Sequence, residues 1–269
     1  MSASCSTPIC SPSRILSTFP EKFRLDGRTA LITGSGRGLG WEMAKGLAEA
    51  GARVLLHGRS RDRLAPRVAE LRAAGRATDA VVFEMVDRAT MKQAIAAAGP
   101  VDILIHNVGE RDRRPFTEIE ADDFARLVDT DLSAAQALIR LVVPGMVERG
   151  WGRLILVTSI AATLAAPGAS SYIAAKAGLE ALARALASEL GATGVTSNAL
   201  SPGFFATETN EALIGSAAGE RMRLRCPARR WADPSEIAGA AIFLASPAAS
   251  YVNGHTLTVD GGVTATYLG

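Results

Sequence analysis

The stretch TGSGRGLG, residues 33–40, lies between the short apolar segment Thr29–Thr33 and Leu39–Ala50, where apolar residues recur at helical spacing. Glycines at a strand-to-helix turn let the backbone approach a pyrophosphate, which the free N–H groups of the helix N-terminus bind. A glycine-rich turn alone is weak evidence and can be purely structural, but this position favours dinucleotide binding. The residues expected to contact the dinucleotide are Gly34, Ser35, Arg37, Gly38, Leu39 and Gly40.

Strand-like and helix-like segments alternate from Arg28 onward. Such alternation predicts an α/β protein, a single doubly wound Rossmann-type domain with a mostly or fully parallel seven-stranded sheet flanked by helices on both faces. We expect this domain to span residues 25–269 and residues 1–24, rich in Ser, Thr and Pro, to form a disordered leader. The further strands are expected at 52–57, 80–86, 102–106, 153–158, 195–200 and 256–259, and the further helices at 61–74, 91–98, 121–149 (one long or two consecutive), 171–190 and 234–245.

Composition narrows the class of protein. The chain has 269 residues, of which 48% are hydrophobic, and this is enough for a substantial core. A net charge of +2 argues against nucleic-acid binding, and no apolar run approaches the roughly 20 residues that span a bilayer, so no membrane partner is expected. The three cysteines and three histidines lack disulfide or metal-ligand spacing. We therefore expect no metal and a cytoplasmic location.

The end of the second strand bears on the choice of cofactor. An acidic residue there would hydrogen-bond the adenosine ribose of NAD, but the chain has HGRSR at 57–61, with no carboxylate. Arg59, Ser60 and the loop residue Arg37 suit a 2′-phosphate instead. The sequence thus favours NADP(H), with NAD(H) possible; the alternative is that Arg59 and Arg61 are solvated surface charges.

Three residues indicate proton-transfer chemistry. Tyr172 and Lys176 are four residues apart on a predicted helix and so share one face. A nearby ammonium lowers the pKa of a phenol, which lets Tyr172 act as a general acid or base. Ser159 follows the strand at 153–158, at the sheet edge where ligands bind, and its hydroxyl can hydrogen-bond a substrate oxygen.

Taken together these motifs resemble the short-chain dehydrogenase/reductase family from about Leu25 to Gly262. The resemblance implies Tyr172 as acid/base, Lys176 as its electrostatic and ribose-binding partner, and Ser159 as the substrate-positioning residue. Its markers are TGSGRGLG (33–40), HNVG (106–109), Ser159, YIAAK (172–176), SPGFFAT (201–207) and VDGG (259–262). It also implies homotetramers or homodimers, and cofactor contacts at Asn107, Gly109, Tyr172, Lys176, Pro202, Gly203 and Thr207.

The chain departs from the family pattern at three places. His106-Asn107-Val108-Gly109 stands where the family has Asn-Asn-Ala-Gly, a largely structural motif. Glu84 aligns with the Asp that contacts the adenine. Asp131 aligns with the fourth catalytic residue, an Asn. Asp131 either supports the water chain to Lys176 and stabilises its ammonium, or only supports the local backbone; both interpretations stay open.

Substrate evidence is thinner. The basic run at 110–114 follows the fourth strand, so Arg111 and Arg114 are candidates to bind a carboxylate or polyol, although a solvated or interface cluster is the commoner case. Phe204 is a candidate for a substrate lid. The segments 201–210, 225–233 and 251–262 are similar to gluconate 5-dehydrogenases, which implies an NADP(H)-dependent oxidoreductase for a sugar acid or polyol. The alternatives are a 3-oxoacyl-carrier-protein reductase and a non-catalytic NADP-binding regulatory protein.

Overall fold

The computed structural model describes residues 19–267 as one α/β domain around a seven-stranded sheet. Residues 1–18 of the expected leader and residues 268–269 lie outside the described residues. The last part of that leader differs from the expectation, because Phe19–Phe23 form a short 3₁₀-helix, η1, whose Phe23 ring lies 6.5 Å from that of Phe243. Residues 19–23 therefore pack on the domain.

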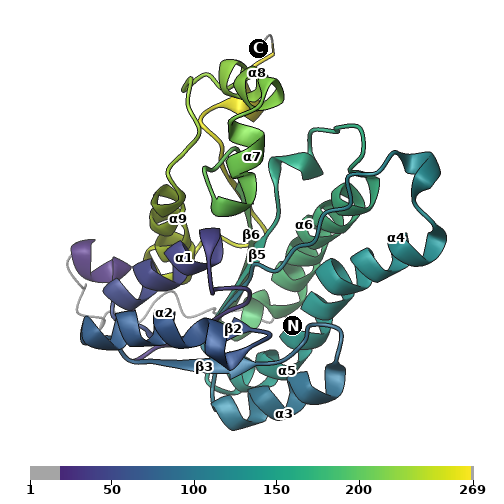
Figure 1. Ribbon diagram of the computed structural model, residues 1–269. Helices are drawn as coiled ribbons and strands as arrows, with labels where there is room; N and C mark the ends of the chain where they lie inside the picture. The colour runs from purple at the N-terminus through teal and green to yellow at the C-terminus, as the bar shows by residue number, and fades with distance from the viewer. Residues whose placement is uncertain (1–18, 268–269) are drawn as a thin grey trace, which may run out of the picture.

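All seven strands run parallel, in the order β3-β2-β1-β4-β5-β6-β7 (Figure 1). Residues of the five central strands are mostly buried, as expected of a parallel sheet covered on both faces, and those of the edge strands β3 and β7 are less so. This confirms the predicted fold class. The strands are β1 (Thr29–Ile32), β2 (Arg53–Gly58), β3 (Thr78–Val82), β4 (Ile103–His106), β5 (Gly152–Val157), β6 (Val195–Pro202) and β7 (Thr256–Val259).

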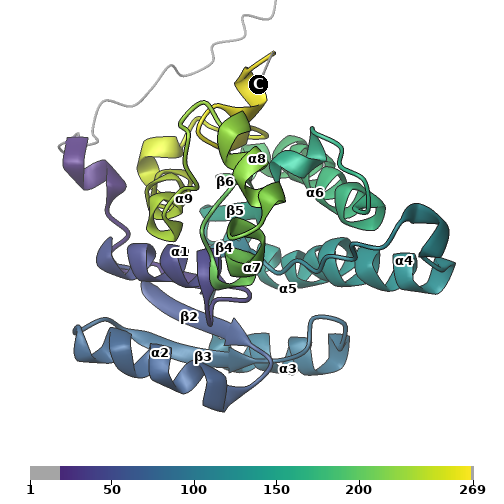
Figure 2. The ribbon, with the colours of Figure 1, turned by 45° about the horizontal axis from the view of Figure 1, so that its top comes forward.

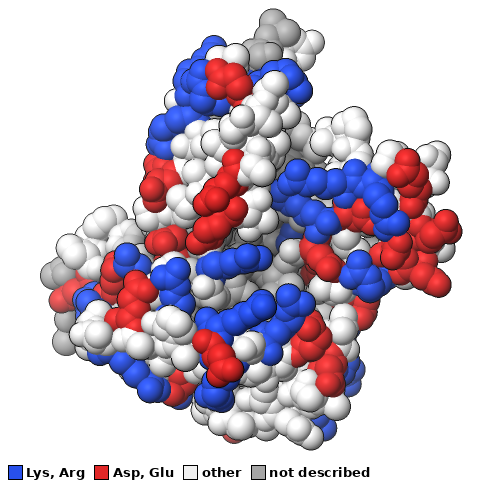
Figure 3. Space-filling model, in the orientation of Figure 1, with Lys and Arg blue, Asp and Glu red and all other residues white. Residues whose placement is uncertain are grey.

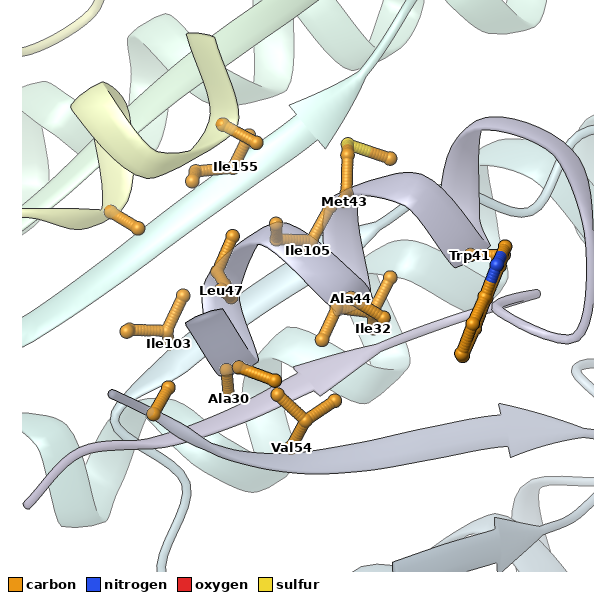
Figure 4. Packing of buried hydrophobic residues seen from close by; sticks show 14 of the residues in the cluster. Ala30, Ile32, Trp41, Met43, Ala44, Leu47, Val54, Ile103, Ile105 and Ile155 are labelled. Atoms are coloured by element: carbon orange, nitrogen blue, oxygen red, sulfur yellow. The ribbon is translucent and has the colours of Figure 1, made fainter. Parts of the chain in front are cut away.

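Helices cover both faces of the sheet (Figure 2). One face packs against α1 (Gly38–Glu49), α2 (Arg61–Ala73) and α9 (Ile237–Ala245). The other packs against α3 (Arg88–Ala98), α5 (Ala134–Glu148) and α6 (Ser170–Leu190). Figure 4 shows the first core, in which Met43, Ala44 and Leu47 of α1 lie over strand residues such as Ile32 and Ile105. The intervening strand residues belong to the second core, as the two-residue period of a strand requires.

The strand predicted at 80–86 ends earlier than expected. Pairing with β2 stops at Val82, yet Phe83 and Met85 remain buried. The apolar pattern continued because the turn after β3 packs into the core, so hydrophobicity alone overstated the strand.

The segment 121–149 contains an irregular helical turn between two helices. Asp129–Ser133 form a π-helical turn, η3, between α4 (Ala121–Val128) and α5, and it contains the buried Asp131. Such turns are frequent at functional sites. Two short helices that the sequence did not predict, α7 (Glu211–Ile214) and α8 (Ala217–Arg225), follow β6. Only Gly219 among their residues is buried, so they lack the apolar stripe that would have revealed them. Across the described part of the chain, no helix is long and apolar enough to cross a membrane.

Candidate active site

The glycine-rich loop lies where the strand order reverses, between β1 and β4. This switch point is where open α/β sheets bind ligands. Gly38, at φ +55°, begins α1, and no side chain caps that helix, so its first N–H groups are free for a phosphate. A Cβ at Gly40 would lie 2.5 Å from the Gly34 oxygen and 2.6 Å from Asn107 Nδ2, so only glycine fits there. These features fit the pyrophosphate of a dinucleotide.

Neighbouring strands hold the loop in place. Asn107 donates from Nδ2 to the Thr33 oxygen (3.1 Å) and from its main-chain N–H to Thr33 Oγ1 (2.8 Å). Ser35 is fully buried, and its Oγ accepts from the His57 N–H at 3.0 Å. The structure thus gives the predicted contacts Asn107 and Ser35 the role of fixing the loop.

His57 is a site residue to which the sequence analysis gave no role. Its Nδ1 accepts from the Gly34 N–H at 3.2 Å, which leaves Nε2–H to donate to the Phe83 oxygen at 3.1 Å. Burial lowers its pKa to about 4, so the ring is neutral at pH 7. A histidine at the end of the strand beside a glycine-rich loop was the available signal, but the hydrogen bonds depend on tertiary placement.

The residues proposed for the adenosine end meet beside this loop. Arg37 and Arg59 are both exposed, and Ser60 begins α2 as its N-cap residue. Arg59 Nη1 lies 3.9 Å from a Glu84 carboxylate oxygen, so Glu84 is placed on the same edge as the arginines. Figure 3 shows further basic side chains on both sides of the hollow that crosses this face.

Ser159, Tyr172 and Lys176 come together at the carboxyl ends of β4 and β5, and all three are buried. Lys176 Nζ donates to the oxygens of Val157 (3.0 Å) and Val108 (3.4 Å) and lies 5.7 Å from the centre of the Tyr172 ring. The two main-chain carbonyls hold the ammonium in place. Ser159 is the N-cap residue of η4 (Ile160–Ala162), its Oγ accepting from the Ala161 N–H.

The phenol of Tyr172 is more acidic than an ordinary tyrosine. Burial raises its pKa, but the charges of Lys176 and Arg111, with hydrogen bonds from Arg111 and Ser159, outweigh that effect and lower the pKa. A phenol of this kind exchanges a proton more readily near neutral pH.

Asp131 faces Lys176 across Gly109. A Cβ on Gly109 would lie 2.8 Å from Lys176 Nζ and 3.4 Å from Asp131 Oδ2. Asp131 Oδ1 accepts from the Glu110 N–H at 2.8 Å, whereas Oδ2 is buried and has no hydrogen-bond partner within residues 19–267. Burial raises the pKa of this carboxyl to about 6, although the Lys176 ammonium opposes the rise.

The segment after β6, residues 203–207, lies against the glycine-rich loop. The Gly203 N–H donates to the Val259 oxygen at 2.9 Å, which fixes the turn after Pro202. A Cβ on Gly38 would lie 3.6 Å from Thr207 Cγ2, so Thr207 sits against the glycine-rich loop. The Phe204 ring lies 5.5 Å from that of Trp231 and forms an apolar wall.

The two arginines proposed for substrate binding differ in their surroundings. Arg111 Nη2 donates to the Tyr172 phenolic oxygen at 3.3 Å. Arg114 instead pairs with Asp112 and with Asp123, at 2.6 Å from the latter, and donates to the Glu118 oxygen. The structure brings Arg111 to Tyr172, while Arg114 braces the loop. Among residues 19–267, no group of three or more His, Cys, Asp or Glu residues is arranged to hold a metal ion.

Residues 34–264 match the family model described as enoyl-(acyl carrier protein) reductase. The chain belongs to the short-chain dehydrogenase/reductase family. This confirms the resemblance drawn from the motifs and identifies the chain as an oxidoreductase acting on CH–OH groups.

Two curated proteins are similar in sequence to this dehydrogenase/reductase over nearly their whole length. Gluconate 5-dehydrogenase from Gluconobacter oxydans is 38% identical over 250 residues, covering 91% of this chain and 98% of the relative. The 3-oxoacyl-[acyl-carrier-protein] reductase from Vibrio harveyi is 34% identical, with 89% and 98% covered.

A solved structure has the same fold as this short-chain dehydrogenase/reductase. It is a gluconate 5-dehydrogenase from Burkholderia cenocepacia in complex with NADP and tartrate. It is 40% identical and has a TM-score of 0.88, with 92% of this chain and 99% of that chain covered.

Proposed function

We propose that this protein is an NADP(H)-dependent oxidoreductase that interconverts a secondary alcohol and a ketone on a sugar acid, as gluconate 5-dehydrogenases do. The observation that carries the proposal is the position of the Tyr172 phenol. It has two cationic neighbours, the buried Lys176 ammonium and the exposed Arg111 guanidinium.

The catalytic set handles the proton. When bound, the nicotinamide supplies the hydride for reduction or takes it up for oxidation. In reduction, Tyr172 donates its phenolic proton to the carbonyl oxygen, and in oxidation its phenolate takes the proton of the hydroxyl. Ser159 hydrogen-bonds the same oxygen and orients it. Lys176, buried and held by two carbonyls, stabilises the phenolate, and it would also bind the nicotinamide ribose.

Three observations support NADP(H) as the cofactor. Arg37 and Arg59 offer guanidinium groups where the adenosine 2′-phosphate would lie. No carboxylate follows β2 in the stretch 57–61, so no residue of that stretch repels the phosphate. The Burkholderia cenocepacia relative was crystallised with NADP. Gly34, Gly38 and Gly40, with Leu39 at the start of α1, would hold the pyrophosphate, and Pro202, Gly203 and Thr207 would border the nicotinamide.

A carboxylate-bearing substrate fits the charges around Tyr172. Arg111 is exposed and reaches the phenol, so a substrate carboxylate can pair with it while the reacting oxygen meets Tyr172 and Ser159. Phe204 would close the apolar side. Because Arg114 is already paired with two aspartates, we assign the carboxylate to Arg111.

For Asp131, we propose that the carboxylate supports Lys176 and is more than a backbone brace. A backbone brace needs only one acceptor oxygen, and Oδ1 already accepts from Glu110. The second oxygen is buried on the Lys176 side of Gly109, where a carboxylate favours the ammonium form.

We also propose that the protein assembles from two or four copies of the chain. Its proposed location is the cytoplasm. The last strand, β7, forms the edge of the sheet, and its side chains are partly or fully exposed. An open edge of a parallel sheet is commonly covered by another element. Sedimentation of the purified protein would give the number of copies.

The decisive experiment follows NADPH consumption by purified protein with 5-ketogluconate and with a short 3-oxoacyl thioester, the substrate class of the Vibrio harveyi relative. We expect turnover with 5-ketogluconate and a loss of about 10²- to 10⁴-fold in Tyr172→Phe. Turnover with the thioester alone would overturn the sugar-acid assignment but keep the mechanism. NADPH binding without turnover of either ketone would favour a regulatory NADP-binding protein.

A further inference from the structure

Tyr172 has two cationic neighbours that differ in their freedom to move. Lys176 is 2% exposed and hydrogen-bonds to two main-chain oxygens. Arg111 is exposed and follows β4 on a loop, with Nη2 at 3.3 Å from the phenolic oxygen and Cζ at 4.8 Å from the ring centre. One cation is therefore buried and held in place, and the other is exposed on a loop.

We propose that Arg111 stabilises the ionised phenol of Tyr172 in the free enzyme, and that a substrate carboxylate cancels this effect by pairing with the guanidinium. An anionic substrate would thus restore the neutral, proton-donating form of the acid/base residue. The second half of this inference rests on the sugar-acid function proposed above.

The other groups around the phenol cannot respond to substrate in this way. Ser159 carries no charge, and Lys176 and Asp131 are almost completely buried. His106, which interacts electrostatically with Lys176, is fully buried and neutral. Among these groups, Arg111 alone is exposed, so a substrate anion reaches this cation first.

Loop contacts leave Arg111 free to change partners. Glu110, its neighbour in sequence, pairs with Arg126 at 2.6 Å, and Asp112 pairs with Arg114. Within residues 19–267, neither carboxylate forms an ion pair with Arg111, whose one hydrogen bond is to Tyr172. A guanidinium so placed exchanges a weak bond to a phenol for a stronger charge-assisted bond to a carboxylate.

Reduction of the ketone requires the protonated form of Tyr172. As hydride adds to the carbonyl carbon, the O–H bond of Tyr172 breaks, its proton goes to the carbonyl oxygen, and the resulting phenolate later regains a proton from solvent. A bare guanidinium at the phenol favours the phenolate, which cannot donate. A guanidinium paired with a carboxylate has no net charge, so the phenol keeps its proton to higher pH.

The ionisation of Tyr172 can be measured without turnover. The chain has three tyrosines, and Tyr251 and Tyr267 are fully exposed, so Tyr251→Phe with Tyr267→Phe leaves Tyr172 alone. In this background we would follow phenolate absorbance against pH. Arg111→Met should raise the midpoint by about one pH unit, because it removes one cation. An unchanged midpoint would overturn the proposal.

Arg113→Met is the matched control. Arg113 has the same charge, lies two residues along the same exposed loop, and is not recorded in contact with Tyr172. Its loss should leave the midpoint where it was. An equal shift in both variants would mean that general loop charge, and not the Arg111 contact, acts on the phenol.

The proposed effect of the substrate carboxylate is tested by comparing D-gluconate with sorbitol, a polyol without the carboxylate. In the Tyr251→Phe, Tyr267→Phe variant that retains Arg111, saturating gluconate should raise the midpoint of the Tyr172 titration by a similar amount. In the same variant with Arg111→Met, gluconate should leave the midpoint unchanged. Sorbitol should have no effect in either protein. Gluconate that binds by calorimetry without moving the midpoint would overturn the carboxylate effect. Gluconate that does not bind would overturn the sugar-acid function instead, while the ligand-free titration still decides the role of Arg111.

Discussion

His106 Nε2 lies 3.0 Å from the main-chain oxygen of Asp131. Two of the positions at which this chain departs from the pattern of its family are therefore in contact. Asp131 belongs to a π-helical turn, in which main-chain carbonyls lose their regular partners, and the imidazole satisfies one of them. The same turn places the Asp131 carboxylate on the Lys176 side of Gly109, so His106 helps to position a group of the active site.

Replacing Asp131 with Asn should stabilise the protein in a pH-dependent way. Burial raises the pKa of this carboxyl to about 6 from 3.8 in the unfolded chain, so the folded state binds the proton more tightly. The ionised carboxylate therefore costs stability as pH rises through that range. We expect Asp131→Asn to gain about 1 to 3 kcal/mol in free energy of unfolding between about pH 4 and pH 8, relative to the wild type. Denaturant titrations at several pH values would measure it; a constant difference would contradict the prediction.

Replacing His106 with Asn should make the protein less sensitive to acid. Burial, with the charge of Lys176, lowers the pKa of His106 to about 3 from 6.5, so the unfolded chain takes up a proton that the folded chain refuses. The neutral ring contributes to the free energy of unfolding above pH 6.5, and this contribution is lost as the pH falls toward 3. Asn does not titrate. The free energy of unfolding should fall less steeply over this range in His106→Asn, and identical slopes would refute the idea. The buried His57 supplies a remaining slope of the same sign.

Adding a methyl group at Gly40 should strongly weaken cofactor binding. The new Cβ would meet the Gly34 oxygen at 2.5 Å and displace the loop from the pyrophosphate. We expect NADPH to bind Gly40→Ala on the order of 100-fold more weakly, by fluorescence titration. Gly239→Ala, in α9, is the control, because its Cβ would meet nothing within 4 Å. That variant should keep its affinity and gain up to about 1 kcal/mol in stability.

Removing the guanidinium of Arg59 should change the preference between cofactors. A charge-assisted contact with the 2′-phosphate is worth about 1.5 to 3 kcal/mol, so Arg59→Ala should raise the KM for NADPH roughly 10- to 100-fold. NADH lacks this phosphate, and its KM should stay unchanged, which makes it the internal control. The Arg37→Ala variant is expected to act in the same direction. If both cofactors were weakened equally, Arg59 would hold the loop and not the phosphate.

The sequence by itself determined the fold class, the seven strands and the family, and it singled out the residues proposed for catalysis. Buried strands and amphipathic helices leave periodic apolar patterns, and the glycine-rich loop, Ser159 and the Tyr172–Lys176 pair occur at spacings that are local in the chain. Local spacing also placed Arg111 directly after the fourth strand, and the structure shows that its side chain contacts Tyr172.

Only the tertiary structure decided the rest. Arg111 and Arg114 look alike in sequence, but one donates to Tyr172 and the other pairs with Asp123 on α4. His57 holds the glycine-rich loop, and His106 the turn of Asp131, through partners more than 20 residues away. Hydrogen bonds and ion pairs across such separations leave no periodic trace, because they depend on which strands become neighbours and on where each side chain then points.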